Sequence, residues 1–270
     1  MSLGVNLALT KTQVPVVGAS YNAMDQIVSS ALIDIEATIS DSYGGSGQTI
    51  TDLLSGTNFT LGADASAGSD DPTFNGSAGD SGAYFSTDGG DFFKALSNIS
   101  ILNGAHKTGG TDSGPVWFAI AFRTPSSFAT QAIFGTSTSS NDQGFRVITL
   151  SSGAIRLQQS DGSGFGWNAS FTPTLSTDTD YVLIVSWDAT SSGDTKIWLN
   201  SDTSSTTSDA FDATTTDATN VFELFANGGG GLILGASRFR GFSAGNEVLD
   251  NTKAADLKNE YEARHGLAYA

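Results

Sequence analysis

The run DYVLIVSWDATSSGDTKIWLNSD, residues 180–202, restricts the possible folds of this chain more than any other stretch. Its first half has apolar side chains at both odd and even positions: Tyr181, Leu183, Val185 and Trp187 in one series, Val182 and Ile184 in the other. A strand that is apolar on both faces is central in a sheet or covered on both sides. Residues 191–194 are typical of a turn, and 196–200 then alternate again. The run therefore predicts an antiparallel hairpin.

The same pattern recurs along the chain. Four further segments combine strand-length apolar runs with Gly, Ser, Thr and Asp between them: 114–125, 131–136, 144–162 and 221–226. Only 15% of residues are charged, and helical periodicity is almost absent between the runs. Many short strands joined by turns favour an all-β fold, an antiparallel two-sheet sandwich, and exclude a helical bundle. The tryptophans at 117, 187 and 198 lie inside strand patterns, and we expect them to hold the sheets together.

One helix is predicted near the C-terminus, at about 251–265. Asp250 or Asn251 can cap its start, and Gly266 can end it. A weaker helical pattern covers Met24 to about Ser30. We divide the chain into an extended N-terminal arm, residues 1–25, and a single sandwich domain, residues 26–270, that contains the closing helix. The arm includes the apolar run VNLALTKTQVPVV, which suits an extended segment lying along a partner subunit; the alternative is a disordered terminus.

The net charge and the absence of cysteine limit the partners. A formal charge of -16 repels both nucleic acid phosphates and anionic membrane surfaces, so we expect neither as a partner. No run approaches the length of a membrane span, and residues 1–20 do not have the pattern of a signal peptide. The chain has no cysteine, which excludes disulfides and thiolate metal sites.

Four segments resemble the laminin G-like or concanavalin A-like jelly rolls, especially those of bacteriophage virion proteins, over roughly residues 33–267. The segments are IDIEATISDSYGGSGQTITDLLSGTNFTLGA (33–63), AYFSTDGGDFFKAL (83–96), the hairpin at 180–202, and GLILGASRFRGFSAGNEVL with the helix ending ARHGL. The chain departs from the family pattern at Ile50, where many relatives carry tryptophan, and in LLSGTNF, which replaces an Asn-Gly repeat. These departures weaken the transfer of any ligand site.

The resemblance implies a virion structural protein: a surface-exposed decoration, tail or fibre module on a phage or phage-like particle. In this interpretation the protein is a homo-oligomer or present in many copies, assembles in the host cytoplasm, and contacts other virion subunits through its arm. A glycan-binding adhesin that attaches the particle to host glycans is the alternative, and a glycan hydrolase of the same fold is a third. The fold alone does not choose among them.

The segment SDGSGFGWNASF, residues 160–171, is the candidate ligand site. It places Phe165 and Trp167 beside Asp161 and Asn168, and sugar sites combine aromatic faces with amide and carboxylate groups. The alternative for Trp167 is a strand residue packed in the core.

We expect no enzyme, no catalytic residue, no metal site and no cofactor. The hydrolase pattern Glu-x-Asp-x-Glu is absent, and Asp34 and Glu36 form a spaced pair that we place at the sheet edge. His106 and His265 are the only histidines, too few for a histidine-built zinc site. Six loop aspartates have the oxygen ligands that calcium prefers, but no EF-hand pattern, so a solvated acidic surface is the favoured interpretation: Asp64, Asp70, Asp71, Asp80, Asp88 and Asp91.

Overall fold

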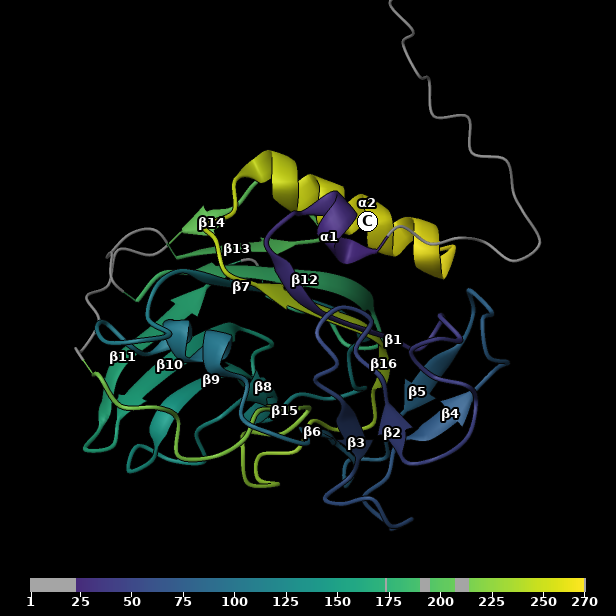
Figure 1. Ribbon diagram of the computed structural model, residues 1–270, viewed down its shortest axis with the longest axis horizontal. Coiled ribbons are helices and arrows are strands. Elements are labelled where there is room, and N and C mark those ends of the chain that lie inside the picture. Colours follow the sequence, from purple (N-terminus) through teal and green to yellow (C-terminus); the bar gives the residue numbers. More distant parts are fainter. Residues whose placement is uncertain (1–22, 173, 190–194, 207–213, 270) are drawn as a thin grey trace, which may run out of the picture.

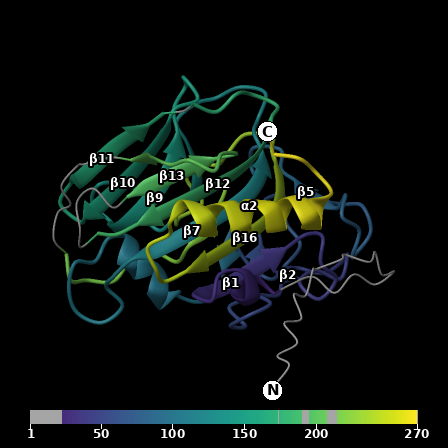
Figure 2. The same ribbon diagram turned by 90° about the horizontal axis from the view of Figure 1, so that it is seen from above.

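The computed structural model describes residues 23–172, 174–189, 195–206 and 214–269, apart from the side chains of Trp167 and Thr206. Two antiparallel sheets lie face to face, and one helix crosses the outside of the first (Figures 1 and 2). The first sheet contains β1 (Ala31–Glu36), β4 (Thr73–Asn75), β5 (Tyr84–Ser86), β7 (Val116–Arg123), β12 (Asp180–Trp187), β13 (Lys196–Leu199), β14 (Ser205–Thr206) and β16 (Arg238–Gly245). The second contains β2 (Thr49–Ile50), β3 (Phe59–Leu61), β6 (Phe93–Ala95), β8 (Gln131–Gly135), β9 (Gln143–Thr149), β10 (Ile155–Asp161), β11 (Phe165–Phe171) and β15 (Glu223–Leu224).

The strand order confirms the predicted sandwich. The first sheet runs β14-β13-β12-β7-β16-β5-β4, with β1 also paired to β16, and the second runs β11-β10-β9-β8-β15-β6-β3-β2. β12 lies between β13 and β7, which confirms that the strand apolar on both faces is central. The predicted turn at 191–194 lies outside the described residues. The predicted strand 221–226 is shorter than expected, because Phe225 has a φ of 65° and the chain leaves the extended conformation there.

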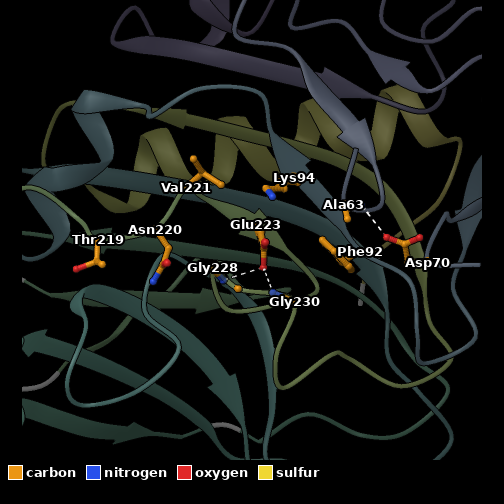
Figure 3. A pocket seen from close by; sticks show the side chains of 11 residues that line it. Ala63, Asp70, Phe92, Lys94, Thr219, Asn220, Val221, Glu223, Gly228 and Gly230 are labelled. Carbon is orange, nitrogen blue, oxygen red and sulfur yellow. Dashed lines mark hydrogen bonds between the residues drawn. The ribbon is translucent and has the colours of Figure 1, made fainter. Parts of the chain in front are cut away.

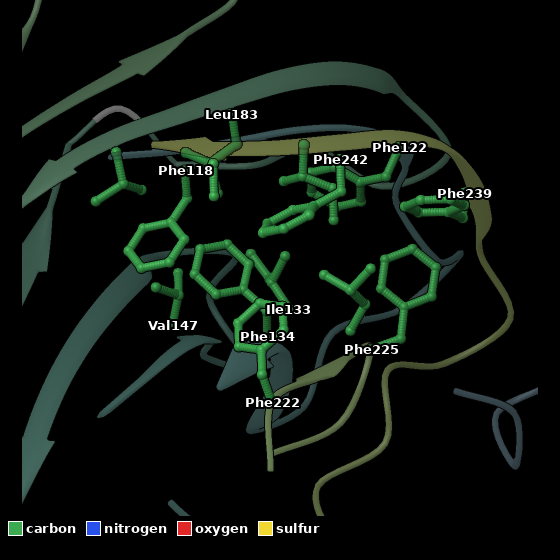
Figure 4. Packing of buried hydrophobic residues seen from close by; sticks show 14 of the residues in the cluster. Phe118, Phe122, Ile133, Phe134, Val147, Leu183, Phe222, Phe225, Phe239 and Phe242 are labelled. Atoms are coloured by element: carbon green, nitrogen blue, oxygen red, sulfur yellow. The ribbon is translucent and has the colours of Figure 1, made fainter. Parts of the chain in front are cut away.

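The core between the sheets is dominated by phenylalanine. Side chains from the first sheet, including Phe118, Phe122 and Phe242, meet Phe134 and Phe222 from the second (Figure 4). Phe118 and Phe134 have ring centroids 5.0 Å apart, and Phe222 and Phe242 are 5.3 Å apart. Burying each large apolar side chain contributes about 1.5–3 kcal/mol, so this layer is the main source of stability.

A second apolar cluster lies on the outer side of the first sheet, beneath the helices. It is formed by α2 (Asn251–His265), α1 (Met24–Ile27) and the outward residues of β7, β12 and β13. Met24, within the predicted arm, is fully buried here. Trp117 and Trp198 belong to this cluster, whereas Trp187 lies between the sheets. Two of the three tryptophans therefore fasten helices onto a sheet.

The ends of α2 follow the sequence prediction. The Asp250 carboxylate accepts a hydrogen bond from the Lys253 backbone N–H at 2.9 Å, and Gly266 ends the helix with a φ of 60°. A short 3-10 helix, η1 (Ser100–Ala105), precedes β7. Within the described part of the chain, no helix has the length and apolarity that crossing a membrane requires.

Candidate functional site

The predicted ligand segment forms the β10–β11 hairpin at the edge of the second sheet. Asp161 Oδ1 accepts hydrogen bonds from the backbone N–H and the hydroxyl of Ser163, both at 2.8 Å. These hydrogen bonds lower the pKa of the Asp161 carboxyl. Asp161 therefore shapes the turn that leads into Phe165. Trp167 pairs with Gln159 in the strand ladder, and its side chain lies outside the described part of the structure.

Phe165 and Asn168 come together through two residues that the sequence analysis did not select. The Arg146 guanidinium carbon lies 4.4 Å from the centre of the Phe165 ring. Arg146 Nε donates to Gln158 Oε1 at 2.7 Å, and Gln158 Nε2 is 3.3 Å from Asn168 Oδ1. Arg146 also donates from Nη1 to the Thr138 carbonyl at 2.9 Å. An aromatic ring, a cation and two amides thus share one face of the sheet.

Cross-strand register extends this group into a line across the whole sheet. Direct pairs join Thr60 to Lys94, Lys94 to Glu223, and Glu223 to Gly135. The line continues from Gly135 to Arg146, from Arg146 to Gln158, and from Gln158 to Asn168. Both strand neighbours of Thr60, Lys94, Glu223 and Arg146 belong to the core between the sheets. Leu157, beside Gln158, and Ala169, beside Asn168, belong to it as well, so the polar side chains occupy the outer face. We call this set the polar row: Thr60, Lys94, Glu223, Arg146, Gln158 and Asn168.

Gly135 lets β8 and β9 approach each other closely in the middle of the polar row. A Cβ atom at this position would lie 2.7 Å from Arg146 Cβ and 2.7 Å from the Phe145 carbonyl oxygen. Contacts that short do not occur between real side chains, so only glycine fits here without moving the backbone.

A pocket of about 490 Å³ lies over the row where β6 meets β15 (Figure 3). Lys94 and Glu223 line it together with loop residues on either side, among them Asp70, Asn220 and Gly229. Glu223 Oε2 accepts two backbone hydrogen bonds at 2.9 Å, one from Gly228 and one from Gly230. Burial raises the pKa of Glu223 in spite of these hydrogen bonds. The pocket thus offers a saccharide-sized space with a cation and a fixed carboxylate at its base.

The sequence contained a partial signal for these missed residues. Polar residues alternate with apolar ones in FRVI and IRLQ, which places Arg146 and Gln158 on an outer face. Which residue of one strand lies beside which residue of the next depends on register, and alternation within a strand does not specify register.

β1, which carries Asp34 and Glu36, pairs only with β16 among the described strands and so lies at an edge of the first sheet, as expected. The two carboxylates are not open to solvent, however. Both are fully buried beneath the end of α2. Asp34 is bonded to Arg264, and Glu36 Oε1 lies 2.8 Å from His265 Nε2. Because a glycosidase needs its carboxyl pair open to the substrate, this arrangement serves the attachment of α2.

The described residues contain no group of three His, Cys, Asp or Glu side chains arranged to hold a metal ion. His106 is buried, and burial lowers its pKa to about 4. Its Nε2 lies 3.2 Å from the Thr216 carbonyl oxygen. The neutral ring therefore has a structural position in the loop before β7.

Several solved structures share this architecture. A structure titled "Cell entry of botulinum neurotoxin type C is dependent upon interaction with two ganglioside molecules" matches with a TM-score of 0.57 and 11% identity, over 90% of this chain and 53% of that chain. The binding domain of botulinum neurotoxin DC in complex with SialylT matches with a TM-score of 0.55 and 11% identity, over 88% and 52%. Trypanosoma rangeli sialidase matches with a TM-score of 0.53 and 9% identity, over 87% and 33%.

The chain thus spans about half the length of the two neurotoxin structures and a third of the sialidase. Neither a protein-family model nor a curated protein sequence matches it. At these identities the likeness establishes the fold alone. The two antiparallel sheets, the closing helix and these neighbours together establish a two-sheet jelly-roll fold.

Proposed function

We propose that this protein is a glycan-binding module that holds a saccharide across the outer face of its second sheet. The polar row carries the proposal. The Asn168 amide and the Lys94 ammonium, the members that are not buried, offer hydrogen bonds to sugar hydroxyls. The buried Arg146 and Gln158 hold Asn168 in place, and Phe165 adds a partly exposed aromatic surface at the end of the row.

The fold neighbours support the same class of function. Their titles name gangliosides, SialylT and a sialidase, all of which concern glycans. The geometry is compatible with this function because a pocket lies over one part of the row and an aromatic residue lies at its other end. The proposal therefore favours the adhesin interpretation over the purely structural one.

A glycan array probed with the full chain tests the proposal. Asn168→Ala and Lys94→Ala remove side chains that are not buried, so both variants should keep the melting temperature of the parent protein. We expect each to weaken glycan binding about tenfold, the cost of one or two hydrogen bonds. Lys196→Ala, on β13 of the first sheet, is the matched control and should bind as the parent does. Unchanged binding by both row variants would contradict the proposal.

The resemblance over residues 33–267 extends this proposal to a particle surface: the module would display its glycan site on a phage or phage-like virion. The arm, residues 1–22 of which lie outside the described part, would attach it to other virion subunits. Mass spectrometry of purified particles tests the location, and deletion of residues 1–22 tests the arm. The deletion should abolish incorporation into particles while leaving the melting temperature unchanged.

A further inference from the structure

Three of the six arginines of this acidic chain gather on the outer face of the first sheet. Register pairs Ser86 with Arg238, Arg238 with Arg123, and Arg123 with Asp180. Arg240 lies on the same strand, at a bulge between Phe239 and Gly241. We call Arg123, Arg238 and Arg240 the arginine cluster.

The arginine cluster lies beside the helix that covers this sheet. No described residue of β4 or β5 belongs to the apolar cluster beneath α2, and β5 lies next to the end of α2 in Figure 2. Arg123, Arg238 and Asp180 are all partly exposed. These three charged side chains can therefore be reached from solvent.

The cluster has more positive than negative charge. Arg123 Nη1 lies 2.7 Å from Asp180 Oδ2, and Arg240 Nε lies 3.9 Å from Asp180 Oδ1. Arg238 instead stacks on Tyr84, with its guanidinium carbon 4.6 Å from the ring centre. Asp180 thus pairs with two of the three guanidinium groups, whereas Arg238 packs on an aromatic ring.

Arg240 is the least satisfied member of the cluster. Only 6% of its surface is exposed, and its Nε and Nη1 atoms are buried without a hydrogen-bond partner among the described residues. Its guanidinium carbon lies 5.6 Å from the Tyr84 ring centre, so the ring forms one wall. Buried guanidinium donors without acceptors are costly, and an anionic oxygen is the acceptor that best matches them.

We propose that the arginine cluster is a second ligand site, which binds the anionic group of an acidic saccharide. The net charge of the chain disfavours polyanions such as nucleic acid or an anionic membrane, whereas a single carboxylate or sulfate meets a local positive field. Neighbouring polar groups fit the sugar: Asn75 Nδ2 donates to the Ser86 hydroxyl at 2.9 Å, beside Arg238. The choice of a saccharide rests on the proposed function; the choice of an anion rests on the cluster itself.

Calorimetric titration of the full chain with sialyllactose, lactose and inorganic sulfate tests this site. We expect sialyllactose to bind more tightly than lactose, and Arg238→Gln to remove about tenfold of that affinity. Arg156→Gln, the same change on the second sheet, is the control and should leave the affinity unchanged. Asp180→Asn removes the competing carboxylate and should strengthen binding severalfold, provided that the melting temperature is retained.

Equal affinity for sialyllactose and lactose would overturn the anion site, as would equal losses in the Arg238 and Arg156 variants. Sulfate binding as tight as sialyllactose binding would overturn the saccharide part. The two proposals can be told apart by their variants. Asn168→Ala, on the opposite sheet, should not change sialyllactose binding at the arginine cluster. Arg238→Gln should not change binding at the polar row.

Discussion

Arg264 donates from Nη1 to Asp34 Oδ1 at 2.9 Å and from Nη2 to Asp34 Oδ2 at 3.0 Å, joining residues 230 positions apart. Both side chains are almost completely buried. Glu260, one helical turn before Arg264, also accepts from Arg264 Nε at 3.1 Å. A two-pronged pair of this kind fixes both the position and the rotation of the last turn of α2 on the first sheet.

Arg264→Met tests this attachment. The change leaves the Asp34 carboxylate buried without its cation, and breaking a buried ion pair costs about 3–5 kcal/mol of the free energy of unfolding. Urea denaturation measures that loss. Lys253, on the same helix, forms a more exposed pair with Glu247, which precedes the helix. Lys253→Met breaks that pair and should cost less than about 1 kcal/mol of the free energy of unfolding. Similar losses in the two variants would contradict the role of Arg264.

Glu36 should make stability depend on acid. Burial raises the pKa of its carboxyl, but His265 and Arg264 outweigh burial, so the net pKa is lowered from 4.5. A carboxyl whose pKa is lower in the folded state stabilises the fold at pH values above its pKa in the unfolded state. That contribution disappears as the pH falls through its pKa in the folded state. We expect the free energy of unfolding to fall more steeply below about pH 4.5 in the parent than in Glu36→Gln. Parallel pH profiles would refute this.

Asp91 should have the opposite effect. Burial, together with the nearby carboxylates of Asp88, Asp71 and Asp70, raises its pKa from 3.8 to about 6. The folded state then binds a proton more tightly than the unfolded state, so Asp91 lowers stability as the pH rises from 3.8 to about 6.

Asp91→Asn should therefore stabilise the protein at about pH 7, by on the order of 1 kcal/mol, and still accept the hydrogen bond from Asp88 N. Melting temperatures at about pH 4 and about pH 7 measure the change, with exposed Asp80→Asn as control. A variant that is less stable at the higher pH would show that the carboxylate is needed there.

The polar row should bind glycans without cleaving them. It contains one carboxylate, Glu223, and that group is occupied by two backbone N–H groups. Glycoside hydrolysis uses two carboxyl groups about 5–9.5 Å apart across the bond that is broken. Incubation with a panel of β-glucans should release no reducing ends. Release that is lost in Glu223→Gln would identify an enzyme and overturn this expectation.

The strands and the closing helix were predictable because their signals are local. Apolar residues on both sides of 181–187 indicated a central strand, and β12 is paired on both edges and covered by α2. Asp250 and Gly266 mark the ends of α2 in the sequence and in the structure. Each of these features depends on residues within a few positions of one another.

The sites depended on contacts between distant parts of the chain. Asp34 and Glu36 lie on an edge strand, as predicted, but Arg264 and His265 from the last helix cover them. Phe165 was selected from the sequence, whereas its contact with Arg146 comes from a bulged hairpin and a neighbouring strand. Alternation specifies which face a residue occupies, so the composition of the outer faces follows from the sequence alone. Strand order and register decide which residues of different strands lie side by side. Both are set by the packing of the complete core, so only the tertiary structure reveals the polar row and the arginine cluster.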